Sequence, residues 1–388
     1  MTYLPSSKIH RLHEDEFNGT KLQLARERLD ISRTRLAELV HASPSFVTAS
    51  EKGRKRPSSD LETLFAAELR VTRQYFYGSV LGRWELCDCH FRHRQAVTNS
   101  EKSLVRGQLY FYSRLVAVLR RFVRLPEINL PEVTLYDLRS VEQIAAEVRR
   151  QWRLNPEKPI GQLCRLIENA GVPIVFSSAQ VANIDAAAHP GDAAVILVRR
   201  RECGATRLNF DVGHELGELI FRSSSNGTPE HERRINRFVG ALLMPESGFA
   251  QHFRARALTI SHLWELKRTW GVSLSAVVQR ALQIGLLSEP DFVRWKKRFA
   301  ARGWTRSEPN EPQFAGPELL RRSLAVLTNQ SISLIDFGAL IGLSELGLAE
   351  LLRENGLGDL MTTIVQAAER QPSVQPSNDQ APEFEIVK

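Results

Sequence analysis

The segment 206–222, with the sequence TRLNFDVGHELGELIFR, limits what this chain can fold into more than any other. His214 and Glu218 are four residues apart, so in a helix they lie on one face and can bind a single metal ion. Glu215 follows His214 directly and is placed to act as a general base toward water at that metal. The segment therefore predicts a helix that carries a metal site.

The segment 230–246 predicts a second helix, because its apolar residues recur at helical spacing. Glu232 lies at the start of this helix and is the predicted third metal ligand. His231 competes for that role, but the two side chains are offset by about 100° on a helix, so only one is expected to point inward. Three protein ligands with one open position are typical of a catalytic zinc site.

The block 20–76 reads as short helices separated by tight turns. Ser32 is a predicted N-cap for RTRLAELV, and Ser43 is a predicted N-cap for PSFVTASEKG, with Pro44 at the first helical position. The small residue Ala37 stands where two helices of a helix-turn-helix would cross closely. The block predicts a helix-turn-helix whose second helix presents short polar side chains.

This block resembles the lambda-repressor-like XRE family of DNA-binding domains over about 60 residues, including the endings 51–53 (Glu-Lys-Gly) and 55–57 (Lys-Arg-Pro). The resemblance implies a double-stranded DNA operator as partner, and a homodimer that binds two half-sites. The predicted DNA-binding residues at the groove and near phosphates are Arg33, Ser43, Ser45, Phe46, Thr48, Ala49, Lys52, Arg54, Lys55 and Arg56.

This helix lacks the Arg, Asn or Gln side chains that read bases through paired hydrogen bonds, so apolar contact with thymine methyls or shape readout would replace them. The alternative is that the block has become a protein-interaction module. DNA binding is favoured, because residues 18–58 hold nine Lys or Arg against four Asp or Glu, whereas the whole chain has a net charge of +8.

The stretch from about 140 to 305 resembles the ImmA/IrrE family of zincin-like metallopeptidases. The resemblance is carried by the segments 184–186, 210–215, 236–245 and 272–292. It implies a Zn²⁺-dependent enzyme that cleaves a repressor protein, relieving silencing after stress or during mobile-element induction.

The sequence departs from that family at Glu218, where the His-Glu-x-x-His pattern has its second histidine. A carboxylate can bind zinc, but His214 with two carboxylates neutralises a divalent ion, so the site polarises water less and suits Mn²⁺ better. The replacement predicts one of three outcomes: weaker peptidase activity, a changed metal preference, or a site kept for sensing. The opposite interpretation makes Glu218 a solvated residue and His214 a core histidine.

The predicted fold class is mainly α with a small β-sheet, an α+β protein. Strands are expected at 172–177 and 193–198. The predicted divisions are a helix-turn-helix domain at 18–80, a bridging helix and linker at 81–133, a zincin-like domain at 134–305, a helical C-terminal region at 306–370 and a disordered tail at 371–388.

Four cysteines are too few and too unevenly placed for a secreted disulfide framework, which favours a reducing, cytoplasmic setting in a bacterium. No apolar run approaches the roughly 20 residues that span a bilayer, and the first residues lack a signal-peptide pattern, so no membrane partner is expected.

Three weaker signals remain. Cys87, Cys89 and His90 lie close together, but without a second pair they favour an incidental cluster over a metal or redox site. The acidic segment 331–352 has a helix-turn-helix rhythm that favours packing or dimerisation. The amphipathic helix at 100–124 fits a dimer seam and a domain-bridging core helix equally well.

These patterns predict a DNA-binding transcriptional regulator with a metallopeptidase domain that cleaves a repressor or another protein. One alternative is a non-enzymatic transcription factor whose degenerate zincin pocket senses a ligand, a metal or a protein. Another is an interaction protein with a vestigial DNA-binding face.

Overall fold

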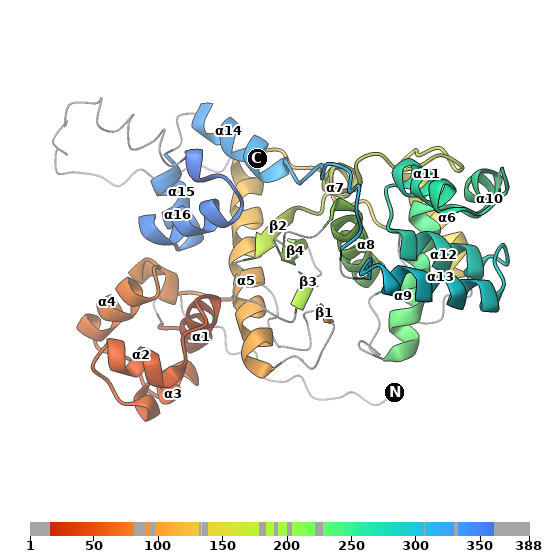
Figure 1. Ribbon diagram of the computed structural model, residues 1–388. Helices are drawn as coiled ribbons and strands as arrows, with labels where there is room; N and C mark the ends of the chain where they lie inside the picture. The colour runs from red at the N-terminus through yellow and green to blue at the C-terminus, as the bar shows by residue number, and fades with distance from the viewer. Residues whose placement is uncertain are drawn as a thin grey trace, which may run out of the picture.

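The structure is a computed structural model, and the parts of the chain that it describes are residues 16–80, 90–93, 98–131, 133, 139–177, 184–189, 193–199, 204–221, 228–255, 257–305, 307–329 and 333–360. They form a mostly helical molecule around one small sheet (Figure 1), which confirms the predicted α+β class. Cys87, Cys89 and the predicted tail at 371–388 lie outside the described residues.

The first half of the chain contains α1 (Gly19–Arg28), α2 (Arg33–Leu39), α3 (Pro44–Glu51), α4 (Ser59–Glu68), the 3-10 helix η1 (Arg73–Phe76), β1 (His90–His93), α5 (Asn99–Phe122), α6 (Val141–Gln151), α7 (Leu163–Asn169), β2 (Ile174–Ser177), β3 (Ile184–His189) and β4 (Val195–Arg199). The second half contains α8 (Ala205–Phe221), α9 (Pro229–Leu243), α10 (Glu246–Arg254), α11 (Ile260–Trp270), α12 (Leu274–Gln283), α13 (Glu289–Ala301), α14 (Leu319–Asn329), α15 (Leu334–Ile341) and α16 (Glu345–Glu354).

The helices α2 and α3 begin where their capping residues predict. The Ser32 hydroxyl accepts a hydrogen bond from the backbone N–H of Arg35, and the Ser43 hydroxyl accepts one from Phe46. Pro44 occupies the first turn of α3, where its missing N–H costs no helical hydrogen bond. The predicted caps of this helix pair are confirmed.

The sheet has the strand order β1-β3-β4-β2, with β2 parallel to β4 and the other pairs antiparallel. Side chains on β4 alternate between two hydrophobic cores: Val195 and Leu197 pack on the side of α5, whereas Ile196 and Val198 pack on the side of α8. Both faces of the sheet are therefore covered by helices (Figure 1). Strand β1 was not predicted; it begins at His90 and pairs with β3, and the prediction of an incidental cluster with Cys87 and Cys89 stays untested.

The long helix α5 lies between the α1–α4 unit and the sheet (Figure 1). It packs against α1 so closely that a Cβ on Gly107 would lie 2.4 Å from the backbone nitrogen of Arg28. A buried ion pair between Arg106 and Glu27, with a shortest N–O distance of 2.5 Å, joins the same two helices. The apolar face of α5 packs against other elements of the same chain, so the structure favours the bridging role of α5 over the dimer seam.

The C-terminal helices α15 and α16 pack back onto the beginning of the chain. Val71 and Leu343 form an antiparallel bridge, flanked by hydrogen bonds from Thr72 N–H to the Gly342 carbonyl and from Ser344 N–H to the Arg70 carbonyl. Helices α15 and α16 share one hydrophobic core with α1–α5, whereas α6–α13 surround a second core.

None of the described helices is long and apolar enough to cross a membrane.

Candidate metal centre and adjoining cleft

Helix α8 lies against the sheet, and two glycines on it let α9 come close. A Cβ on Gly213 would lie 2.9 Å from a methyl carbon of Val239, and a Cβ on Gly217 would lie 2.9 Å from one of Ile235. Real Cβ atoms essentially never approach so closely, so a larger residue at either position would push α9 away from α8. The Gly-x-x-x-Gly spacing in α8 is the sequence signal for this contact, and the sequence reasoning missed it.

The close contact brings together the three predicted ligands. His214 Nε2 lies 3.5 Å from Glu218 Oε1 and 3.7 Å from Glu232 Oε2. One donor atom from each residue lies within 4.8 Å of the other two. The His214 and Glu218 side chains are buried, whereas the Glu232 side chain is 39% exposed and forms the open side of the cluster.

The donor set fits a divalent metal ion on two grounds. First, neither ring nitrogen of the buried His214 has a hydrogen-bond partner among the described residues, and an unpaired buried imidazole is costly unless something else binds it. Second, an imidazole with two carboxylates is a ligand set that zinc and manganese accept. His214, Glu218 and Glu232 would hold the ion.

The predicted general base Glu215 is completely buried in α8, next to His214 in the chain. It does not belong to the three-residue cluster of possible ligands among the described residues. Successive residues on a helix are separated by about 100°, so Glu215 lies beside the ligand face of α8 and not on it.

His231 and Glu232 both approach the cluster, so the expectation that only one would do so is wrong. His231 Nε2 lies 2.9 Å from Glu218 Oε2, while Glu232 faces His214. Both fit because they belong to the first turn of α9, where they approach different ligands on α8: the buried His231 meets Glu218 and the half-exposed Glu232 meets His214.

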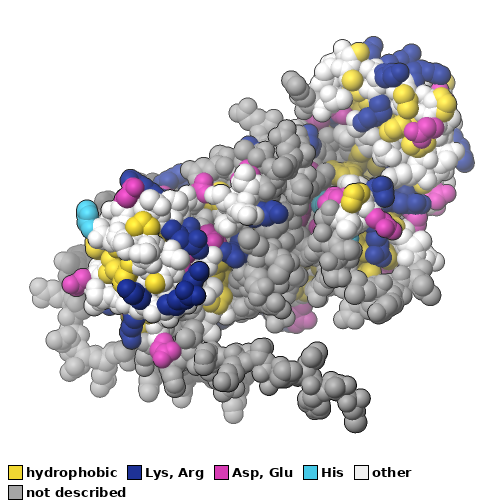
Figure 2. Space-filling model, turned by 90° about the horizontal axis from the view of Figure 1, so that it is seen from below, with side chains coloured by type: hydrophobic (Ala, Val, Ile, Leu, Met, Phe, Trp, Pro, Cys, Tyr) yellow, Lys and Arg dark blue, Asp and Glu magenta, His cyan; other side chains and the backbone are white. Residues whose placement is uncertain are grey.

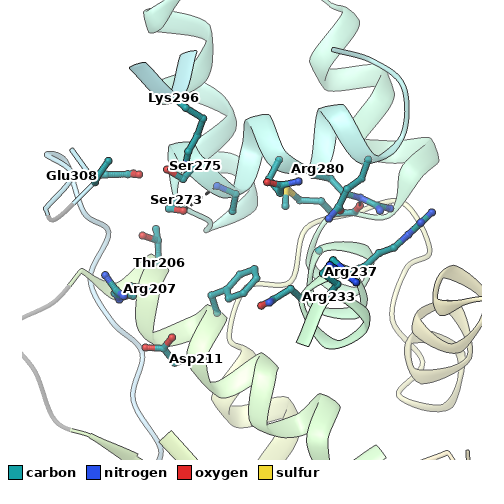
Figure 3. A pocket seen from close by; sticks show the side chains of 18 of the residues that line it. Thr206, Arg207, Asp211, Arg233, Arg237, Ser273, Ser275, Arg280, Lys296 and Glu308 are labelled. Atoms are coloured by element: carbon teal, nitrogen blue, oxygen red, sulfur yellow. Dashed lines mark hydrogen bonds between the residues drawn. The ribbon is translucent and has the colours of Figure 1, made fainter. Parts of the chain in front are cut away.

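A cleft of about 1140 Å³ opens beside the first turns of α8 and α9 (Figure 3), and none of the three candidate ligands lines it. Its lining residues Phe210 and Asp211 precede His214 by about one turn of α8, and Asn236 follows Glu232 by about one turn of α9. The remaining walls come from the start of α6, from α12 and α13, and from the segment 304–311. The cleft is large enough for a polypeptide segment rather than a single small molecule.

The predicted DNA-binding residues lie on the α1–α4 unit, whose lower face gathers Lys and Arg side chains around an apolar patch (Figure 2). The side chains of Lys52, Arg54, Lys55 and Arg56 are exposed. Arg33 departs from the others, because its guanidinium pairs with buried Glu51 at 2.6 Å. That contact supports the fold of the unit and competes with a role at DNA.

The hydroxyls on α3 are largely engaged locally. Ser43 and Ser45 share a hydrogen bond of 2.9 Å, and the Thr48 hydroxyl donates to the Pro44 carbonyl. Phe46 lies beneath the ammonium group of Lys55, 5.9 Å from its ring centre. The groove-facing role of these residues remains a prediction.

Residues 167–282 match the family Peptidase_M78, described as the IrrE N-terminal-like domain. The match covers α8 and α9 entirely and therefore includes all three candidate ligands and Glu215. No curated protein matches this chain. The chain thus contains a domain similar to a metallopeptidase family, which indicates a metallopeptidase-type regulatory function.

Proposed function

We propose that this protein is a DNA-binding transcriptional regulator whose metallopeptidase domain cleaves a repressor or another partner protein. The observation that carries the proposal is the His214, Glu218 and Glu232 cluster, which combines a buried imidazole that makes no hydrogen bond within the described residues with an open side. The proposal places these three residues around a zinc ion, with manganese as the alternative.

A bound zinc or manganese ion would supply Lewis acidity, polarising a peptide carbonyl and lowering the pKa of water. The protein's own residues would have roles separate from that of the metal. Glu215, buried beside the ligands, would take a proton from the attacking water and return it to the leaving amine. The adjoining cleft would hold the substrate segment in an extended form next to the ligands.

A second candidate function is a non-enzymatic regulator that senses a metal, a ligand or a protein through this domain. Two carboxylates and a neutral imidazole cancel the charge of a divalent ion, which reduces its power to activate water. The donor set of His214, Glu218 and Glu232 carries this candidate, because it has two carboxylates where the family pattern has one.

The first experiment is the metal content of the purified protein by mass spectrometry, with His214→Ala, Glu232→Ala and Glu218→His variants. His252→Ala is the matched control, because that exposed histidine lies on α10, outside the cluster. About one zinc or manganese per chain, lost only in the first two variants, supports the metal site on which the peptidase depends, and cleavage of a partner protein then separates the peptidase from the metal sensor. A metal-free native protein that gains zinc with Glu218→His points to a domain that has lost the activity.

The DNA-binding half of the proposal is tested separately, by measuring affinity for the protein's own promoter DNA at several salt concentrations. The exposed cations that follow α3 predict an affinity that falls steeply with salt. Salt-independent or absent binding would favour the interaction-module alternative.

A further inference from the structure

The cleft beside the metal cluster carries a marked excess of positive charge. Among its described lining residues, seven cations face four carboxylates. The cations are Arg139, Arg207, Arg233, Arg234, Arg237, Arg280 and Lys296, and the carboxylates are Asp211, Glu230, Glu308 and Glu311. A cleft with one sign of charge and low-dielectric walls concentrates ligands of the opposite sign.

Part of this charge is already compensated within the chain. Arg280 pairs with Glu142 at 2.7 Å, and Arg237 lies 3.5 Å from the same carboxylate. Burial raises the pKa of Glu142, but its hydrogen bonds to Arg280 outweigh that effect and the pKa lies below its ordinary value. Arg234 stacks on the ring of Phe221 at 4.4 Å. Arg280, Arg237 and Arg234 therefore make contacts within the chain that hold the wall of the cleft together.

Two other cations are left for a ligand. Within the described part of the chain, neither Arg233 on α9 nor Lys296 on α13 has a carboxylate partner, and Lys296 has only a long hydrogen bond of 3.4 Å to the Ser275 hydroxyl. Figure 3 shows that Lys296 and Arg233 approach the cleft from different helices. An anionic ligand between them would therefore have to be extended.

The chain itself shows how an acidic segment is recognised here. In the segment 307–311, Ser-Glu-Pro-Asn-Glu, the Glu308 carboxylate accepts the backbone N–H of Leu274 at 2.9 Å, and the Glu311 carboxylate accepts that of Thr206 at 3.1 Å. Both carboxylates also contact the buried ammonium group of Lys267, at 2.8 and 2.5 Å. One wall of the cleft thus already holds an acidic segment of the chain, bent at Asn310, through two backbone N–H groups at helix starts and a buried lysine behind the wall.

We propose that this cleft binds an acidic, extended polypeptide segment of the protein substrate, with Arg233 and Lys296 as its main charge contacts. The inference rests on the proposed function, since it names the substrate class of the same domain. Binding itself needs neither the metal nor cleavage.

The test is fluorescence anisotropy with a labelled Glu-Ser repeat peptide and its Gln-Ser counterpart as probes. The Glu-Ser peptide should bind more tightly to the wild type, and Arg233→Gln and Lys296→Gln should each weaken it by roughly three- to tenfold. Lys297→Gln and Arg254→Gln, at exposed positions outside the cleft, are the matched controls and should leave the affinity unchanged. Thermal melting curves check that the variants are folded.

Equal affinity for the two peptides, or equal effects of cleft and control variants, overturns the proposal. Displacement of the peptide by inorganic phosphate at an equal concentration also overturns it, because the site would then select a small anion. The His214→Ala variant separates this inference from the proposed function. It should lose the metal and still bind the peptide, so a wild type that binds the peptide but holds no metal refutes the peptidase alone.

A different observation carries a second inference, about His231. The Glu218 side chain offers Oε1 to His214 at 3.5 Å and Oε2 to His231 at 2.9 Å, so its two oxygens face two different histidines. The Glu218 and His231 side chains are only 7% and 2% exposed. The hydroxyl of Thr228, the N-cap of α9, accepts the backbone N–H of His231 and thereby fixes the turn that carries the ring.

We infer that His231 is a positioning residue that holds Glu218 for the metal through its Nε2–H. This inference rests on the proposed metal site. The contact satisfies the second carboxylate oxygen, which a histidine at position 218 would not have. It therefore explains how a carboxylate can replace the second histidine of the family pattern in a buried place.

The test is metal affinity, measured by competition with a chromophoric chelator. His231→Phe should weaken the zinc affinity by about ten- to hundredfold, and His231→Gln, which keeps an N–H donor, should recover part of the loss. In the Glu218→His background the same His231→Phe change should have a much smaller effect. Unchanged affinity of His231→Phe overturns the inference, whereas a wild type without metal affinity refutes the proposed metal site itself.

Discussion

The buried carboxylate of Glu168 gives a pH-dependent stability that one substitution should remove. Glu168 lies on α7 and is only 3% exposed, and it accepts the backbone N–H groups of Glu318 and Leu319 at 2.9 and 3.1 Å. Burial raises the pKa of Glu168 to about 7 from an ordinary 4.5, although the two N–H donors act in the opposite direction. The start of α14 is thus held by a carboxyl group that prefers to be protonated.

The sign and size of the effect follow from linkage. Between pH 4.5 and about 7 the folded protein binds a proton that the unfolded chain releases, so the free energy of unfolding falls as the pH rises through this range. At about 1.4 kcal/mol per pH unit, the gap corresponds to roughly 3 kcal/mol, which is fully present below pH 4.5 and lost above pH 7. The Glu168→Gln variant keeps an amide acceptor and cannot titrate.

The assay is urea unfolding, followed by tryptophan fluorescence at pH 5, 6, 7 and 8, for the wild type and Glu168→Gln. The difference in unfolding free energy between the two proteins should change by up to about 3 kcal/mol across this range, in favour of the glutamine variant at high pH. Glu157→Gln, at an exposed position, is the control and should keep the wild-type pH dependence. Parallel pH profiles for the wild type and Glu168→Gln would refute the reasoning.

Three further predictions concern the packing of the helices and the proposed DNA-binding face. Arg106→Met alone leaves Glu27 buried without its main partner and should destabilise the protein by about 3–5 kcal/mol in urea unfolding, whereas adding Glu27→Leu should recover much of that loss. Gly217→Ala should cost about 1–3 kcal/mol and lower the metal content, because its Cβ would collide with α9; unchanged metal content would show that the close contact is not needed. Lys55→Gln should reduce the salt dependence of promoter binding by about one counterion, measured by anisotropy, whereas Lys297→Gln on α13 should not.

The local features of the fold could be predicted from the sequence because they depend on neighbouring residues. Ser32 and Ser43 cap helices whose first N–H groups need an acceptor, wherever the helices lie in the fold. His214 and Glu218 share a face because four residues make about one helical turn. Strand β1 could not be predicted in the same way, since its pairing with β3 depends on residues about a hundred positions away.

The residues of the candidate metal site could be predicted from the sequence, whereas the contacts between them could be predicted less well. Periodicity placed Glu232 near the metal ligands, but the 100° offset did not predict that His231 also faces α8, where it contacts Glu218. That argument treats the metal as the single target of α9, whereas the helix faces two ligands of α8 that lie one turn apart. The packing of α15 on η1 and α5 could not be predicted either. An amphipathic pattern predicts that one face of a helix is buried, but it does not identify the element that packs against that face.

The burial of the apolar face of α5 also limits where a homodimer can form. The apolar residues that fitted a dimer seam on α5, among them Leu104, Phe111 and Leu115, are at most 2% exposed within a single chain. They pack against α1, the sheet and α15, so a second copy cannot reach them without displacing the α1–α4 unit or the C-terminal helices. The predicted homodimer therefore needs another surface, and a substitution on the α5 seam should unfold the chain rather than separate two folded copies.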